Sequence, residues 1–528
     1  MVLVCEVGIS GREAQVEGYA VDGLAASAEA VAAGLGVLVA GLAGLVSGLT
    51  GPGAAGLSFD EVEQRVMTQG RELLQQVIQH VMDAQAAAEP RLAAVTDAAG
   101  VPRTRAERGH ARTVISQFGP VVIRRMAYRA PGQPNLHPRD AALNLPPRRY
   151  SWQVQQAVVE YVLAGAYEQA QRFVAAATGI TIGKQQLEQI TAGAAADAAG
   201  FYPALARKQE QQHGQRGQPA EPLAISADGK GVAMRPESRR RRTKAPEARV
   251  RNFDKRAGTG EKGHKRMAQT GCVFDIAPVP RTPEQVLACG AGGGKKAPRS
   301  LRRWYTIDIA ADRTATTGAI FDEAERRDPG HLRQWIALVD GDNHQIRLIE
   351  SQAAARGIDL VILIDFIHVQ EYLWKAGWCF HAPRDPAIET WVTAQGLDIL
   401  HGRAADVAAR IRQLAGNHPP AGPEHAKTIR KTLAYLDAKQ PYLDYPRALA
   451  AGWPIATGVI EGACRHLVKD RMDITGARWG LPGAEAILKL RALRSNGDFN
   501  AYWRYHLEQE RRRVHETRYL NGLTPHAA

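Results

Sequence analysis

LAISADG (223–229) is the stretch that decides the fold, a short apolar run that ends in an aspartate followed by a glycine. Four comparable runs follow it along the chain: GCVFDIAPV (271–279), WYTIDIA (304–310), IALVDG (336–341) and LVILID (360–365). Apolar runs of this length, rich in Val and Ile, predict strands that are buried in a sheet.

Helical segments are expected between and after the later strands, at residues 317–327, 343–355 and 367–378. The order is then three strands in succession, followed by strands that alternate with helices. This order predicts an α/β fold with a mixed sheet and flanking helices. Residues 385–450 are predominantly helical and interrupt the alternation.

Three acidic residues stand out by their position. Asp228 and Asp340 each end a predicted strand and precede a glycine, and Glu461 lies near the start of a helix in GVIEGACRHLVKDR. Carboxylates are the ligands that Mg²⁺ prefers, and sheets of this kind form sites beyond the ends of their strands. Two such ions ~3.5–4 Å apart can drive phosphoryl transfer. A single Asp-Gly pair is more simply a turn, so the argument rests on the three acids together.

Basic and aromatic residues follow Glu461. Arg465 and Lys469 lie four and eight residues further on, on roughly the same helix face, and are expected to contact phosphate. Arg471, Arg478 and Trp479 are expected to meet the DNA backbone and to stack on a base. The alternative is a surface helix crossed by salt bridges.

Asp365 and His368 form a second polar pair, in which the aspartate ends a strand and the histidine opens a helix. Asp365 competes with Asp340 for the second catalytic position. His368 is expected to be a structural, hydrogen-bonded histidine rather than a metal ligand.

The charge of the chain is concentrated in one block. The 528 residues carry a net charge of +13, and residues 229–270 contribute fourteen Lys and Arg against four Asp and Glu. Such a block predicts a polyanion-binding surface, with a solvated basic loop as the alternative. The cations expected to neutralise DNA phosphates are Lys230, Arg239, Arg240, Arg241 and Arg242.

The composition bounds the class of protein. With 45% hydrophobic and 23% charged residues, the chain is neither disordered nor collagen-like, and its length predicts about three to four domains. Its five cysteines are scattered along the sequence, so a zinc ribbon is not expected. An odd, scattered set of cysteines is typical of a protein in a reducing cytoplasm.

The N-terminal region is expected to be mainly helical. Val31–Leu49 is uncharged and long enough to cross a bilayer, but its five glycines favour a Gly/Ala-rich helical leader over a membrane anchor. A helix is predicted over residues 59–89, and a short hairpin around Gly119 and Pro120. Residues 151–199 are predicted to form successive helices with a turn at Gly179. This spacing is typical of a helix–turn–helix element that binds DNA, and also of two amphipathic helices that only pack together.

Several of these segments resemble a known family. SADGKGVAMR, KRMAQTGCVFDIAPVPRTPE, LVDGDNHQI, DFIHVQEYLWKAG and PIATGVIEGACRHLVKDRMDITGARWG are similar to the DDE transposases of bacterial insertion sequences, specifically the ISKra group, over roughly residues 100–515. The resemblance implies an RNase H-like core with a helical insertion before the catalytic glutamate. It implies Asp228, Asp340 and Glu461 as the metal-binding acids, and Asp365 and His368 as an accessory pair.

Together with the composition, the resemblance predicts five parts. They are a Gly/Ala-rich leader of unknown role outside the resemblance (1–57), a mainly helical region with a short hairpin that is expected to bind DNA (58–207), the first part of the core (221–380), the helical insertion (381–452) and the last part of the core with Glu461 (453–515). A Gln-rich linker at 208–220 separates the second part from the third.

The expected function is DNA strand cleavage and strand transfer with two Mg²⁺ ions, for which Mn²⁺ is the alternative. The expected partners are transposon-end DNA, target DNA and further copies of the chain, without a membrane, in a nucleoid-associated cytoplasmic protein. The alternatives are an RNase H-like nuclease that does not join strands, and an inactive DNA-binding protein derived from a transposase.

Overall fold

The computed structural model describes residues 21–211, 221–239, 265–288, 295–418 and 422–525, with side chains from residue 36 onward except those of residues 209–211 and 475. The chain divides into two compact units. The first comprises Met1–Ala157, Val174–Thr181 and Leu507–Ala528, and the second comprises Val158–Phe173 and Ile182–His506.

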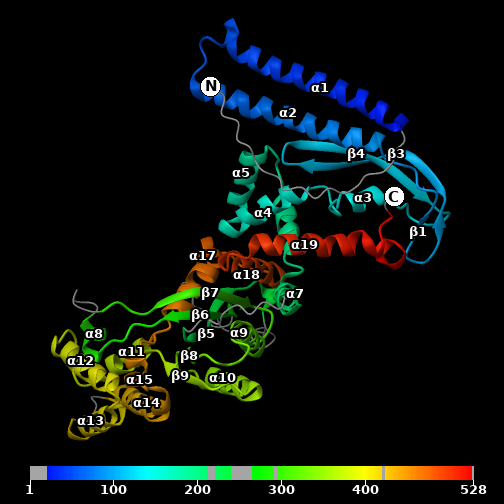
Figure 1. Ribbon diagram of the computed structural model, residues 1–528. Coiled ribbons are helices and arrows are strands. Elements are labelled where there is room, and N and C mark those ends of the chain that lie inside the picture. Colours follow the sequence, from blue (N-terminus) through cyan, green and yellow to red (C-terminus); the bar gives the residue numbers. More distant parts are fainter. Residues whose placement is uncertain (1–20, 212–220, 240–264, 289–294, 419–421, 526–528) are drawn as a thin grey trace, which may run out of the picture. The chain divides into compact units, whose positions relative to one another are not determined.

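A five-stranded sheet forms the centre of the second unit, with the strand order β7-β6-β5-β8-β9 (Figure 1). The strands are β5 (Leu223–Ala233), β6 (Lys265–Ala277), β7 (Arg299–Asp308), β8 (Trp335–Val339) and β9 (Leu360–Ile364). β5, β6 and β7 pair antiparallel, whereas β5, β8 and β9 run parallel. The prediction of a mixed sheet with flanking helices is therefore confirmed. All five residues of β8 are buried, as expected of a strand whose sequence is continuously apolar.

Helices follow the strands as predicted: α9 (Arg313–Arg327), α10 (Asn343–Arg356) and α11 (Phe366–Gly377). α9 packs directly on β6 at Gly271, where a Cβ atom would lie only 2.5 Å from the side chain of Ile320. Glycine at this position allows the close approach of helix and strand.

The helices predicted between residues 385 and 450 are present as α12 (Ala387–Leu400), α13 (Ala404–Asn417), α14 (Pro423–Lys439) and α15 (Tyr445–Ala450). The chain then continues through α16 (Gly458–Ala463), a π-helical turn (Cys464–Lys469), α17 (Asp470–Met472), α18 (Leu481–Ser495) and α19 (Phe499–Val514). The short α8 (Pro283–Leu287) follows β6.

The first unit contains a helix packed on a hairpin. The helix α2 (Phe59–Ala87) begins at a Ser58 capping box, and the hairpin consists of β3 (Arg105–Ser116) and β4 (Gly119–Arg129). The side-chain amide of Gln79 donates to the Val122 carbonyl (2.9 Å) and accepts from the Val122 amide (2.8 Å), which joins α2 to β4. The hairpin is confirmed, but its turn precedes Gly119 and Pro120, which begin β4.

The remaining elements of the N-terminal region are α1 (Val21–Thr50), which lies alongside α2 (Figure 1), β1 (Val95–Thr96), β2 (Pro102–Arg103), α3 (Pro138–Ala142), α4 (Trp152–Ala164), α5 (Tyr167–Thr178), α6 (Lys184–Ala194) and α7 (Ala198–Gln211). The helices expected over residues 151–199 are thus confirmed. The linker expected at 208–220 begins within α7, and its residues 212–220 lie outside the described residues.

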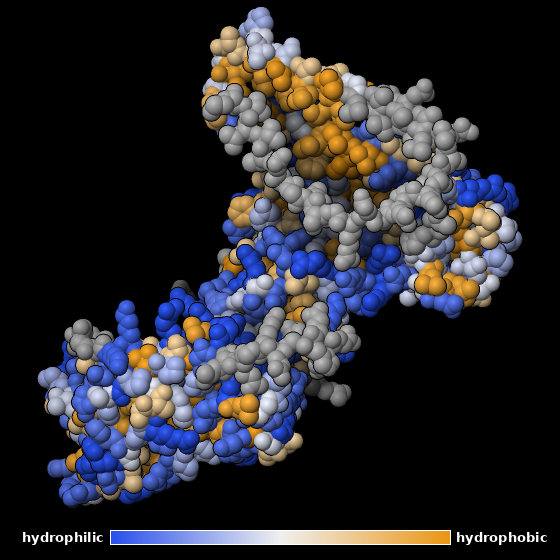
Figure 2. Space-filling view, in the orientation of Figure 1, coloured by the Kyte–Doolittle hydropathy of each residue, from blue (hydrophilic) through white to orange (hydrophobic). Residues whose placement is uncertain are grey.

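The leader expected over residues 1–57 is described from residue 21, as the helix α1. In the described residues, α1 and α2 expose large apolar side chains, among them Val37, Leu42, Phe59 and Met67 (Figure 2). Among the helices that the structure describes, none combines the length and the apolar character that a membrane span requires.

Candidate active site

Three aspartates lie at the same level on three adjacent parallel strands. Ser226 of β5 pairs with Leu338 of β8, so Asp228 and Asp340, two residues further along each strand, are in register. Val339 pairs with Ile364 of β9, which places Asp365 level with Asp340. Adjacent strands are ~4.8 Å apart, so the three carboxylates gather at one edge of the sheet.

Asp228 and Asp340 line one cleft at this edge, together with Gln269, Arg313 and Gln345. Both aspartates are half-buried. The structure therefore brings together two of the three acids that the sequence singled out.

The backbone around Asp340 holds its carboxylate in place. Oδ1 of Asp340 accepts the amide of Asp342 (2.9 Å) across Gly341. Gly341 has a φ of +95°, and a Cβ atom there would lie 3.0 Å from the hydroxyl of Tyr435. Position 341 therefore requires glycine for two reasons: its φ is positive, and the hydroxyl of Tyr435 lies too close for a side chain.

The carboxylate of Asp228 is held in a similar way. Its Oδ1 accepts the amide of Gly229 (2.6 Å). The strand around it is tied to its neighbours, because Ser226 Oγ donates to the Leu338 carbonyl (2.7 Å) and Gln345 Nε2 donates to the Ala227 carbonyl (2.5 Å).

The helix that carries Glu461 approaches Asp228 through Cys464. Burial, followed by the carboxylate of Asp228, raises the pKa of the Cys464 thiol to about 12. Cys464 is buried and lies three residues after Glu461, at the start of the π-helical turn. Glu461 itself is exposed in the first turn of α16.

Asp365 is fully buried and is held by three protein donors. Its Oδ1 accepts the amide of Ile367 (2.7 Å) and so caps α11, and its Oδ2 accepts both the amide (2.8 Å) and the hydroxyl of Thr457. The same hydroxyl lies 3.0 Å from Oε1 of Glu461. Thr457 therefore joins the buried aspartate to the exposed glutamate. His368 lies in the first turn of α11 and is half-buried.

The cations expected to contact DNA fall into three groups. Arg465, Lys469 and Arg478 are exposed. Lys230, on β5, and Arg239 are half-buried. Arg240, Arg241 and Arg242 lie outside the described residues, as does most of the basic block.

Arg471 and Trp479 are placed differently from the prediction, because both are buried, with exposed fractions of 2% and 6%. The guanidinium of Arg471 lies 4.9 Å from the centre of the Trp479 ring and 5.4 Å from that of Tyr167, and its Nε donates to the Val162 carbonyl (2.8 Å). Burial lowers the pKa of Arg471 to about 10. The structure thus places both side chains in the interior and not on the exposed surface that the predicted DNA contact assumes. They form an interior cation–π stack.

Two residues of the helical insertion, Tyr435 and Lys439, were missed by the sequence analysis. Tyr435 stacks on Tyr372 with ring centres 3.9 Å apart, and burial, followed by nearby acidic groups that include Asp340, raises the pKa of its hydroxyl. Lys439 is buried and donates to Asn343, and burial lowers the pKa of its amine. Both lie about 95 residues from Asp340 in the sequence, and no local pattern marks them.

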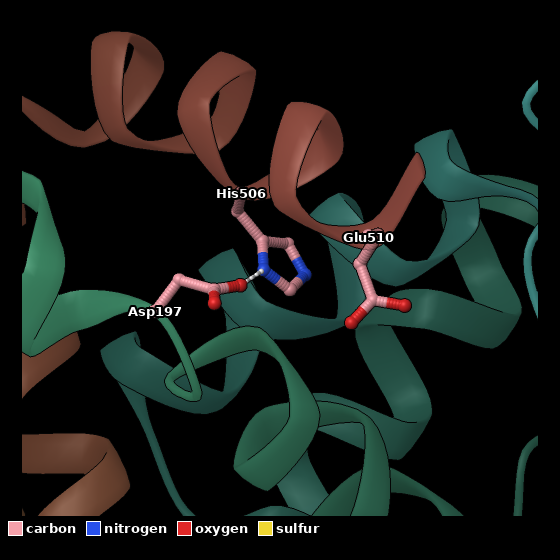
Figure 3. A group of neighbouring side chains, drawn as sticks. All are labelled: Asp197, His506 and Glu510. Carbon is pink, nitrogen blue, oxygen red and sulfur yellow. Dashed lines mark hydrogen bonds and ion pairs between the residues drawn. The ribbon is translucent and has the colours of Figure 1, made fainter. Parts of the chain in front are cut away.

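A further polar group lies on α19. His506 is buried and its Nδ1 lies 2.7 Å from Oδ2 of Asp197 (Figure 3). Glu510, one turn further along the helix, pairs with Arg513 (2.6 Å). The carboxylate of Asp197 satisfies a buried imidazole, which is what a structural histidine requires.

The chain matches no family model and no curated protein.

Proposed function

We propose that this protein is a DDE transposase with an RNase H-like core, in which Asp228, Asp340 and Glu461 bind two Mg²⁺ ions. One observation supports this most strongly. Asp228 and Asp340 each lie two residues beyond the paired Ser226 and Leu338 of adjacent parallel strands, and both line the same cleft. The helix of Glu461 approaches Asp228 through Cys464, and Thr457 links Glu461 to Asp365.

The donor set fits a hard cation. The three proposed ligands are carboxylates, the oxygen donors that Mg²⁺ prefers. Oδ1 of Asp228 and Oδ1 of Asp340 each accept a hydrogen bond from a backbone amide. These bonds fix the orientation of the two carboxylates as metal ligands. Two bound Mg²⁺ ions supply an activated attacking oxygen and charge stabilisation at the leaving oxygen.

Asp340, rather than Asp365, is the second catalytic acid in this proposal. Asp365 is fully buried, and its two oxygens accept three hydrogen bonds from the protein. A carboxylate engaged in this way is poorly placed to bind an ion as well. We assign Asp365 a positioning role, because Thr457 connects it to Glu461.

The exposed cations Arg465, Lys469 and Arg478, with Lys230 beside the cleft, neutralise the phosphates of the bound strand in this proposal. Each such contact steepens the salt dependence of binding. Transposition joins two transposon ends, so we expect several copies of the chain to assemble on DNA.

The test is a cleavage assay with Mg²⁺ on DNA that contains the sequences flanking the coding region. Asp228→Asn, Asp340→Asn and Glu461→Gln are each expected to abolish cutting while DNA binding, measured by fluorescence anisotropy, persists. Full activity in any of them removes that residue from the site.

Two further measurements separate the alternatives. Cleavage without joining in a strand-transfer assay would identify a nuclease, and binding without any metal-dependent cleavage would identify an inactive copy. Asp365→Asn is expected to lower thermal stability, and its cleavage activity is expected to exceed that of Asp340→Asn.

A further inference from the structure

A second cavity of about 500 Å³ adjoins the acidic cleft. Its lining includes Lys265 and Arg266 at the start of β6, Asp312 and Arg313 at the start of α9, and the imidazole of His344 on α10. It shares two lining residues, Gln269 and Arg313, with the cleft that holds Asp228 and Asp340. The two hollows are therefore immediate neighbours.

The cavity is positively charged. Lys265, Arg266 and Arg313 are cations at neutral pH, whereas Asp312 is the carboxylate that lines the cavity and Asp342 pairs with Arg313 from the neighbouring cleft, which leaves an excess of one positive charge. The carboxylate of Asp312 caps α9 by accepting the amide of Ala315 (3.1 Å), and is thus engaged by the helix. Arg266 donates to the carbonyls of Ile309 (2.6 Å) and Ala310 (2.8 Å), which hold the guanidinium in place without adding a negative charge.

Arg313 connects this cavity to the aspartates. Its Nη1 lies 2.5 Å from Oδ2 of Asp342, and the amide of Asp342 donates to Oδ1 of Asp340 (2.9 Å). The arginine side chain is 39% exposed and therefore remains open to a ligand in the cavity. A single cation thus lies between the acidic cleft and the basic cavity.

We propose that this cavity binds a backbone phosphate of the DNA strand that is cut at Asp228 and Asp340, close to the scissile phosphate. The inference rests on the proposed function and adds to it the side from which the strand is held, namely from β6 and the start of α9. An arginine and a lysine at one phosphate supply charge-assisted hydrogen bonds. They fix the register of the strand over the acids without reading its sequence.

The experiment measures DNA affinity of the full chain by fluorescence anisotropy at several salt concentrations. Lys265→Ala and Arg313→Ala are each expected to weaken binding and to reduce the slope of log K against log salt by about 1. Lys265→Arg and Arg313→Lys keep the charge and are expected to keep the slope. Arg412→Ala is the matched control, since Arg412 is an exposed arginine paired with Asp437 on the insertion, and it is expected to behave as the wild type.

A slope that is unchanged in both alanine variants, in a wild type that binds and cuts DNA, would overturn the inference and leave the proposed function standing. If the wild type does not bind DNA, both are overturned. A last arm replaces chloride with inorganic phosphate at equal ionic strength. Phosphate is expected to weaken DNA binding more than chloride does in the wild type but not in either alanine variant, because free phosphate competes with the strand for the cavity. Equal weakening by the two anions in the wild type would contradict the proposed phosphate site.

Discussion

Replacing Thr457 with valine removes one hydroxyl that lies between two carboxylates and changes little in shape. The buried Asp365 loses one of its three donors, and Glu461 loses its contact with the helix start. A hydrogen bond to a charged group contributes about 1.5–3 kcal/mol, and its loss here leaves a buried carboxylate less well satisfied.

The size of the effect on thermal stability follows from the size of the unit. Thr457 lies in a unit of roughly 340 residues, whose unfolding entropy is about 0.7 kcal/mol per kelvin at ~2.1 cal/mol per kelvin per residue. A loss of about 1.5–3 kcal/mol then lowers Tm by about 2–4 °C. Cleavage is expected to slow as well, because Glu461 is no longer oriented.

The matched control is Thr191→Val. Thr191 is also buried, but its hydroxyl donates to the neutral Leu187 carbonyl (2.8 Å) within its own helix. Its replacement is expected to cost about 1 kcal/mol and to leave cleavage unchanged. Equal Tm values for the two variants, with wild-type cleavage in Thr457→Val, would refute the role given to this hydroxyl.

Three other outcomes are expected. Gly341→Ala places a side chain at a φ of +95° and against a neighbouring hydroxyl, so it should destabilise the protein by about 1–3 kcal/mol and slow cleavage. Gly357→Ala has a similar φ of +66° but open space, and should destabilise without slowing cleavage. Arg471→Ala should lower Tm, measured by calorimetry, while the salt slope of DNA binding stays at the wild-type value, because this side chain is interior. The raised pKa of Cys464, about 12, keeps its thiol neutral at pH 8. Iodoacetamide should then modify the half-buried Cys379 before the buried Cys464, and peptide mapping that finds Cys464 modified before Cys379 would contradict this placement.

Local sequence determined the elements of the sheet. Strands such as β8 are short and continuously apolar, and a strand of that kind is stable only when both of its faces are covered. The same reasoning located Asp228 and Asp340, since an acid followed by glycine after such a run lies where the chain leaves the interior. The helices that follow the later strands were also expected from the sequence, and they form as α9, α10 and α11.

Tertiary structure decided what each polar side chain does. Asp340 and Asp365 look alike in the sequence, but Thr457, about 90 residues further along, engages one of them and not the other. From the sequence, Arg471 and Trp479 were expected at the surface. In the folded chain the arginine is enclosed by Tyr167 and by the Val162 carbonyl, which lie some 300 residues earlier. The physical reason is that strand formation depends on neighbours along the chain, whereas the burial and hydrogen bonding of a charge depend on partners that only the folded chain brings together.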